Sequence, residues 1–419
     1  MRSVLLLLVC VLICLAPIGC VDLLDQNLRG TVDVIVVDGT INNLAEPQLI
    51  RLNRSKADPL TGRFGSLPIT KAKVEVIVDA SQVISCHETD DGTYQLPSDF
   101  KGEVGHTYQL RFQLVDGTQY ESVPETMPRG VPIDRVFHKF NSNSLPPKRP
   151  DGQASLVIAA SDIFIDWYDP VSEHNYYRWD WKLWERQEWC RSCGKGYYLI
   201  WNYYESDQLF EDCYSVSMLP PRDGAIYGPS ALYFVNDYRC RMECWEILYN
   251  YDINVFDDAL SNGGQLTGRR VAQIPYYQKH GCLVEIRQSS LTRPAYEYVK
   301  QLQQQAENTG GLADTPPTAI VGNVHNVAND QEGVVGYFSA APVSAKRYWL
   351  DRQDATGTPP GLFYGLRGIL PSPEDATVDP NTEIGKPSPG IGGKNADRPP
   401  TAICVPSDSR TPFKPEGWR

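Results

Sequence analysis

The sequence predicts a mainly β protein with two β-sandwich-like domains, the first of them immunoglobulin-like, one amphipathic helix and a long Pro/Gly-rich C-terminal segment. Three observations support this class. Apolar residues alternate with polar ones over several short segments, Asp-Gly pairs punctuate these segments, and one stretch has a clear helical period. About 400 residues follow the N-terminal apolar run, which is more than one hydrophobic core usually serves, so we expect two domains.

The N-terminus resembles a lipoprotein signal. Arg2 precedes an almost wholly apolar run at residues 4–18, which is shorter than the roughly 20 residues of a membrane-spanning helix. Gly19 and Cys20 close the run like a lipobox. We therefore expect residues 1–19 to be the signal peptide, Cys20 to carry the lipid and residues 20–30 to form a tether. The alternative is an ordinary signal peptide with Cys20 in a disulfide. No later segment is long and apolar enough to cross a bilayer, so lipid would be the anchor.

We place the immunoglobulin-like domain at residues 31–128. Period-two alternation predicts strands at 31–37, 74–78, 94–96 and 108–114. Three Asp-Gly pairs predict the turns between strands: Asp38-Gly39, Asp91-Gly92 and Asp116-Gly117. Prolines in residues 129–152 indicate a linker.

The second β domain is expected at residues 153–350. Further strands are expected at 156–158, 163–167, 175–189, 197–203, 231–235, 249–255 and 282–287. A helix is predicted at 292–307, with Ser290 or Thr292 as its cap, Pro294 in its first turn and Gly310-Gly311 as its stop. Residues 351–419 contain many proline and glycine residues, so we expect an extended C-terminal segment there.

An unusually aromatic strand raises the possibility of a binding surface. Tyr177, Trp179, Trp181 and Leu183 share one face, which favours a core position over a platform for stacking sugar rings. Trp184 lies on the opposite, polar face, and Trp189 is next to a cysteine. These two tryptophans are the candidates for ligand or partner contact.

The cysteines after residue 20 are even in number, which in an exported protein indicates disulfides. Six of them lie between positions 190 and 282, so the second domain should carry a disulfide-rich insertion. The eight candidates are Cys86, Cys190, Cys193, Cys213, Cys240, Cys244, Cys282 and Cys404. The alternative is zinc, because the C-x-x-C and C-x-x-x-C spacings in this set suit a metal ligand site. Disulfides are favoured, and no metal or cofactor is predicted.

Motifs of catalysis are missing from the sequence. There is no Gly-x-Ser-x-Gly elbow, no His-Glu-x-x-His pair and no phosphate loop, so no catalytic residue is predicted. A formal net charge of −12 argues against a nucleic-acid partner. Asp162, Asp166 and Asp169 could contribute to a calcium site, but the ligand count favours solvated acids at a strand end.

Several segments together resemble a known family. In order they read "VVDGTINNLAEPQLIRL", "ITKAKVEVIVD", "GHTYQLRFQLVDGTQYES", "YEYVKQLQQQAENTGGLADTPPTAIVGNVHN" and "GVVGYFSAAPVSAKR", with the looser tail "CVPSDSRTPFKPEGW". This order is similar to that of the DUF4249 family of Bacteroidota outer-membrane lipoproteins. The most specific positions are Gly322, Asn323, Gly336, Tyr337 and Phe338. For them we expect an architectural role: a turn, then a strand that seats the two aromatic residues.

The resemblance implies two β-rich domains, a lipid anchor in the outer membrane and a TonB-dependent receptor as partner. It implies no activity and no catalytic residues. Asp22 and Asp25, close behind Cys20, slightly favour display on the cell surface over the periplasmic face. The leading hypothesis is a non-enzymatic accessory or substrate-capturing partner of the transporter. The alternatives are a glycan-binding surface module and, second, a hydrolase with no recognisable motif.

Overall fold

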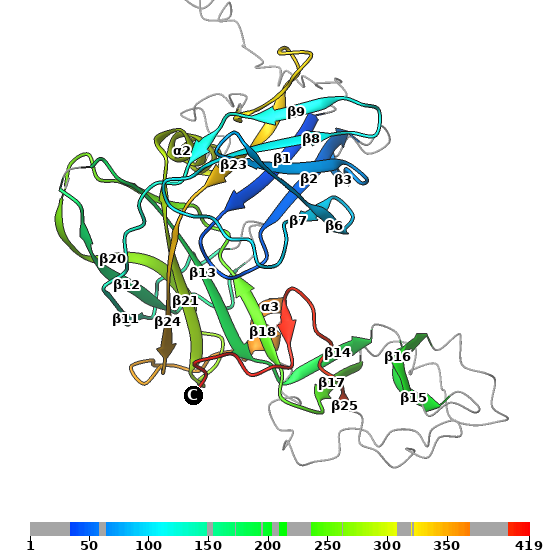
Figure 1. Ribbon diagram of the computed structural model, residues 1–419. Coiled ribbons are helices and arrows are strands. Elements are labelled where there is room, and N and C mark those ends of the chain that lie inside the picture. Colours follow the sequence, from blue (N-terminus) through cyan, green and yellow to red (C-terminus); the bar gives the residue numbers. More distant parts are fainter. Residues whose placement is uncertain are drawn as a thin grey trace, which may run out of the picture.

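The computed structural model describes residues 34–57, 64–148, 154–171, 173–193, 196–202, 209–215, 236–261, 263–307, 320, 322–368 and 401–419. The expected signal peptide, Cys20, the tether and the strand expected at 231–235 lie outside these residues. The predicted β class is confirmed. The described residues form two β-sandwiches and a smaller disulfide-linked module, which lie at the top, at the lower left and at the lower right of Figure 1.

The first sandwich packs two six-stranded sheets around one core. One sheet contains β1 (Val34–Ile41), β2 (Leu49–Ala57), β3 (Phe64–Pro68), β6 (His87–Asp90), β7 (Thr93–Gln95) and β23 (Val334–Ala340). The other contains β4 (Lys73–Val78), β5 (Gln82–Ser85), β8 (Thr107–Gln113), β9 (Gln119–Ser122), β10 (Glu125–Thr126) and β22 (Val324–Asn326). The sandwich architecture agrees with the sequence, and its immunoglobulin-like identity stays a prediction.

Strand alternation explains this core, as β8 shows most clearly. Tyr108, Leu110 and Phe112 are buried on one face, and the residues between them are partly exposed. Two of the predicted turns are present, because Gly92 and Gly117 adopt φ of +72° and +91°.

The turn predicted at Asp38-Gly39 is wrong. Both residues lie inside β1, which is paired with β2 on one side and with β23 on the other. A Cβ on Gly39 would lie 3.3 Å from side-chain atoms of Ile50 and Phe338. Close packing at a central strand therefore accounts for this glycine.

β22 and β23 show that the first domain is not a continuous stretch of sequence. β23 pairs with β1 in parallel and β22 pairs with β9, so residues far beyond position 128 complete both sheets. Phe338 of β23 is fully buried in the first core. The predicted boundaries at 31–128 and 153–350 are therefore incorrect for these two strands. Local periodicity gives no information on which distant strand an edge will pair with.

The Gly-Asn and Gly-Tyr-Phe motifs hold β22 and β23 in place in the first sandwich. The Asn323 side chain accepts a hydrogen bond from Phe338 N at 2.9 Å and donates one to Phe338 O at 2.7 Å, as a neighbouring strand would. A Cβ on Gly322 would lie 1.6 Å from Gly336 O, and one on Gly336 would lie 1.8 Å from Val37 O. The side chain of Tyr337 donates a short hydrogen bond to the buried Glu125. The motif is thus an element of the architecture.

The second sandwich packs a three-stranded sheet against a six-stranded one. The smaller sheet contains β11 (Arg135–Asn141), β12 (Ala160–Asp169) and β20 (Gly264–Pro275). The larger contains β13 (Tyr176–Arg186), β18 (Trp245–Tyr249), β19 (Asn254–Asp257), β21 (Cys282–Leu291), β24 (Val343–Leu350) and β26 (Arg410–Thr411). Tyr177, Trp179 and Leu183 are buried in this core and Trp181 is partly buried, as the sequence predicted.

The linker predicted at 129–152 is wrong over much of its length. Val131 and Ile133 are buried in the second core, and β11 forms an edge of its smaller sheet. The prolines that suggested a linker flank this strand and do not interrupt it.

The predicted helix is present as α2 (Arg293–Glu307), and its Gly310-Gly311 stop lies outside the described residues. The Thr292 hydroxyl caps it, accepting a hydrogen bond from Ala295 N at 3.3 Å. The same hydroxyl donates to Glu125 Oε2 at 2.7 Å, so the helix cap is tied to the first sandwich. Nearby, Arg287 of β21 forms a two-pronged ion pair with Glu46, at 2.9 and 2.7 Å.

The disulfide-linked module contains β14 (Trp189–Cys193), β15 (Gly196–Asn202), β16 (Leu209–Ser215), β17 (Asn236–Cys240) and β25 (Thr401–Ala402). The described parts of residues 351–419 are folded onto the protein, contrary to the extended segment predicted. They form the short helix α3 (Leu362–Arg367), β25 and β26, and Trp418 packs against Trp245 and Trp349. Periodicity could not reveal these short elements.

Candidate functional site

A pocket of about 330 Å³ opens beside the disulfide-linked module. Three segments form its walls: the connection from β13 to β14, the loop around 278–280 and the segment 358–364 that starts α3. Trp189 is half-buried in one wall and Phe363 in another, and their ring centroids are 5.1 Å apart. Trp189 therefore stays a candidate contact residue.

Charged groups surround these rings. The Arg239 guanidinium lies 5.1 Å from the centroid of Trp189, and Glu188 lies 3.6 Å from Arg239. Lys279 and His280 line the opposite wall. Aromatic rings surrounded by charged and hydrogen-bonding groups suit a ligand that combines an apolar ring face with polar substituents.

A buried ion pair behind the pocket fixes its loop. The side chains of Arg352 and Glu185 are both fully buried and form a short ion pair. Arg352 also donates to the carbonyl oxygens of Gln278 and His280, at 3.0 and 2.9 Å. Although burial opposes its charge, the Glu185 carboxylate raises the pKa of Arg352. Arg352 therefore positions the pocket wall at residues 278–280. Its own backbone is in the left-handed region, with φ of +57°.

The third wall depends on close packing at α3. Gly361 donates its N–H to Tyr277 O at 2.8 Å, and a Cβ on Gly365 would lie 2.4 Å from the Tyr277 ring. Leu362 is buried, while Phe363 and Tyr364 face the pocket. Sequence reasoning missed this wall, because the segment was expected to be extended.

Trp184 is not at the surface, contrary to its prediction. Its side chain is only 6 % exposed and belongs to a cluster with Trp245, Ile247 and Leu283, against which Trp349 and Trp418 pack. The C-terminal residues therefore cover the polar face of β13 around Trp184. Trp418, near the C-terminus, was the sequence feature that could have indicated that Trp184 is covered.

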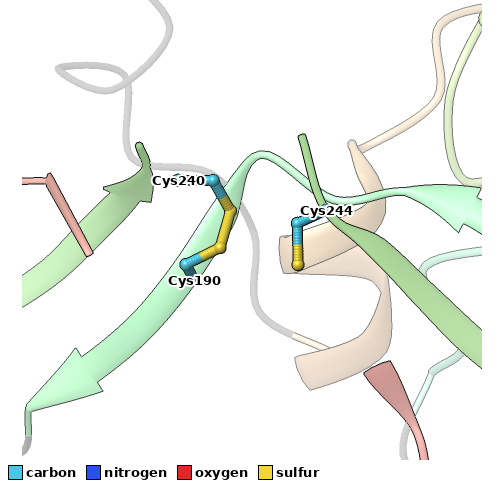
Figure 2. A group of neighbouring side chains, drawn as sticks. All are labelled: Cys190, Cys240 and Cys244. Carbon is cyan, nitrogen blue, oxygen red and sulfur yellow. A yellow bond between two sulfur atoms is a disulfide. The ribbon is translucent and has the colours of Figure 1, made fainter. Parts of the chain in front are cut away.

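The disulfides pair cysteines from different segments. Cys190 bonds Cys240, and Cys244 bonds Cys404, 160 residues away. Figure 2 shows the first bond with Cys244 beside it. Cys213 is disulfide-bonded as well, and the side chain of Cys193 lies outside the described residues.

Cys86 and Cys282 are unpaired, so the disulfide prediction is wrong for both. They belong to different cores, with Cys86 packed against the first and Cys282 fully buried in the second. Burial raises the pKa of the Cys86 thiol to about 12. Both act as small apolar side chains.

The zinc alternative is not supported. The sulfur atoms of Cys190, Cys240 and Cys244 lie within 4.8 Å of one another, as ligands would. Zinc binds thiolates, however, and each of these sulfur atoms is bonded to another sulfur. The spacing therefore reflects two neighbouring disulfides.

The three aspartates considered for calcium do not form one ligand shell. Asp162 accepts a hydrogen bond from Ser144, Asp166 from Gly268 N, and Asp169 from Tyr177 and Gly263 N. Asp162 and Asp169 are buried, so the expectation of solvated acids is wrong for both. Buried carboxylates need such partners.

Comparisons with known proteins place the chain in one family. No curated protein and no solved structure matches it. In the part of the chain that the structure describes, no helix is long and apolar enough to cross a membrane. Residues 21–347 match the family described as "Domain of unknown function (DUF4249)". Since the match covers most of the sequence, the chain belongs to the DUF4249 family.

Proposed function

We propose that this protein is a non-enzymatic lipoprotein, anchored through Cys20 in the outer membrane, that captures a ligand for a TonB-dependent receptor. The family match supports this proposal, because it begins at residue 21, directly after the proposed lipid-carrying cysteine. Asp22 and Asp25 favour the cell-surface face. The capture role depends on one observation, the pocket that Trp189 and Phe363 line.

The pocket fits binding better than catalysis. In the described residues that line it, Glu188 is the carboxylate and His280 the imidazole, with neither a second carboxylate nor a serine beside them. A hydrolase of the common two-carboxylate or Ser–His type needs such a pair. A half-open site with ring faces can bind a ligand and release it to a partner.

Affinity purification tests the partnership. A tagged chain solubilised from outer membranes should retain a TonB-dependent receptor, and a Cys20→Ala variant should lose it, because the chain would leave the membrane. Metabolic labelling with a palmitate analogue should mark the wild type alone. A wild-type chain that carries lipid but retains no receptor would exclude the partnership.

A glycan is the second candidate, favoured by the Trp189 and Phe363 ring faces. Binding to a polysaccharide panel should be lost in Trp189→Ala and in Phe363→Ala. Tyr251 is an aromatic residue outside the pocket and 95 % exposed, so Tyr251→Ala is the matched control. Equal binding by all three variants would show that the pocket is not the glycan site. Trp184→Ala does not test contact, since Trp184 is buried.

A further inference from the structure

A second cluster of functional groups lies at the other end of β13 from the pocket. The eleven residues of β13 span about 33 Å, so the two sites are well separated. His174 precedes β13, Asp257 ends β19 and Asp258 follows it. One potential ligand atom from each of the three lies within 4.8 Å of the other two.

One buried oxygen in this cluster accepts no hydrogen bond from the described residues. Asp258 is fully buried, and its Oδ2 accepts a hydrogen bond from Asn175 Nδ2 at 3.3 Å. Its Oδ1 accepts no hydrogen bond from the described residues, yet it faces His174 Nε2 at 3.4 Å. A buried carboxylate oxygen without a partner is costly, so its position requires an explanation.

A second buried carboxylate close by adds to the need for a compensating positive charge. Asp169 is also fully buried, and its own oxygens are satisfied by Tyr177 and Gly263 N. Two buried carboxylates, those of Asp169 and Asp258, therefore lie near each other. Arg293 lies near the cluster, but it is paired with Glu297 at 2.7 Å.

We propose that His174, Asp257 and Asp258 bind a divalent metal ion of the Zn²⁺ class. One imidazole nitrogen and two carboxylate oxygens suit such an ion, whereas calcium takes six to eight oxygen ligands. Three protein ligands leave a position for water or for a further ligand. His174 and Asp257 are 45 % and 33 % exposed, so that position opens to solvent.

The geometry needs little rearrangement. Ligand atoms around a tetrahedral zinc ion lie about 3.3 Å apart, given bonds of about 2.0–2.1 Å. His174 Nε2 is already 3.4 Å from Asp258 Oδ1 and 2.5 Å from Asp257 Oδ1. Of these two distances, only the second must widen, by less than about 1 Å. The partly exposed Asp257 side chain can make this adjustment.

Neighbouring groups hold the three ligands in place. The His174 ring stacks on Tyr176 with centroids 4.7 Å apart, and Tyr176 packs against Tyr296 of α2. Asp257 Oδ1 accepts a hydrogen bond from Ala259 N at 2.9 Å. Contacts of this kind orient ligands before a metal arrives.

Calorimetry with zinc chloride on the metal-stripped full chain in detergent tests the proposal. We expect one ion per chain in the wild type. His174→Ala and Asp257→Asn should each weaken binding at least about tenfold, because each removes one of three ligands. Asp257→Asn changes a partly exposed residue, so it keeps the test decisive if an Asp258 variant fails to fold.

Two controls separate this site from adventitious binding. His325→Ala removes an exposed histidine of β22, and Cys86→Ser removes a partly buried thiol. Both should bind zinc as the wild type does. The proposal is overturned if zinc produces no binding heat, or if His174→Ala and Asp257→Asn bind it as tightly as the wild type.

Discussion

Gly336 is a residue of the first sandwich that cannot accept a side chain without strain. It adopts φ of +107°, and an added Cβ would lie 1.8 Å from the carbonyl oxygen of Val37. We expect Gly336→Ala to lower the free energy of unfolding by more than about 3 kcal/mol, measured by urea titration. Gly333→Ala is the matched control, because no atom lies within 4 Å of its added Cβ. Equal effects at the two glycines would contradict this account.

Arg352 and Glu185 allow a test of the buried ion pair. Arg352→Met should lower the free energy of unfolding by about 3–5 kcal/mol, since it leaves the fully buried Glu185 charge without its partner. Adding Glu185→Gln should restore part of this loss. Arg186→Met, on an exposed neighbour, should change stability by about 0.5 kcal/mol or less. A double variant no more stable than Arg352→Met would show that the two side chains are not coupled.

Single residues also show where sequence reasoning reaches its limit. Trp189 was identified because it stands beside a cysteine, and it lies in the pocket. Trp184 was misplaced because a polar strand face indicates solvent only when nothing else covers it. Arg352 and Phe363 were missed, since buried charge partners and pocket walls arise from contacts between distant segments.

Among the elements, the C-terminal strands β25 and β26 lie close in sequence to a covalent link. The bond between Cys244 and Cys404 closes a loop of 160 residues. β25 lies just before Cys404 in the sequence, and β26 follows it. Cys244→Ser combined with Cys404→Ser should lower the free energy of unfolding by about 2–5 kcal/mol. Limited proteolysis should then cut first near residues 401–411. Cys86→Ser should leave the cleavage pattern unchanged, and release of the same segment in both variants would refute the link's role.

Element types were easier to predict than element partners. The strands around Val76 and Leu110 and the helix after Thr292 follow from period and capping, which are local properties. Asp38-Gly39 was misread because the same dipeptide can form a turn or permit close packing. The short elements α3, β25 and β26 have no period to detect, and their neighbours fix them.

At the scale of the whole molecule, the direct connection from β23 to β24 links the two sandwiches. Only Ala341 and Pro342 separate the two strands, so one stretch of chain belongs to both sandwiches. We expect a fragment of residues 31–128 to remain unfolded by circular dichroism and NMR, because Phe338 and Val334 are missing from its core. Fusing residues 320–341 to it through a flexible linker should restore folding. A well-folded fragment without that addition would disprove this dependence.

The late arrival of β23 has a consequence for biosynthesis. Roughly 200 residues separate β10 from β23, so β1 lacks its parallel partner until that stretch has been made and exported. During that interval the side of β1 that β23 will cover is an unprotected edge, open to aberrant pairing with other nascent chains. A holding chaperone that shields this edge should therefore raise the yield of native protein, and should matter far less once residue 340 has emerged.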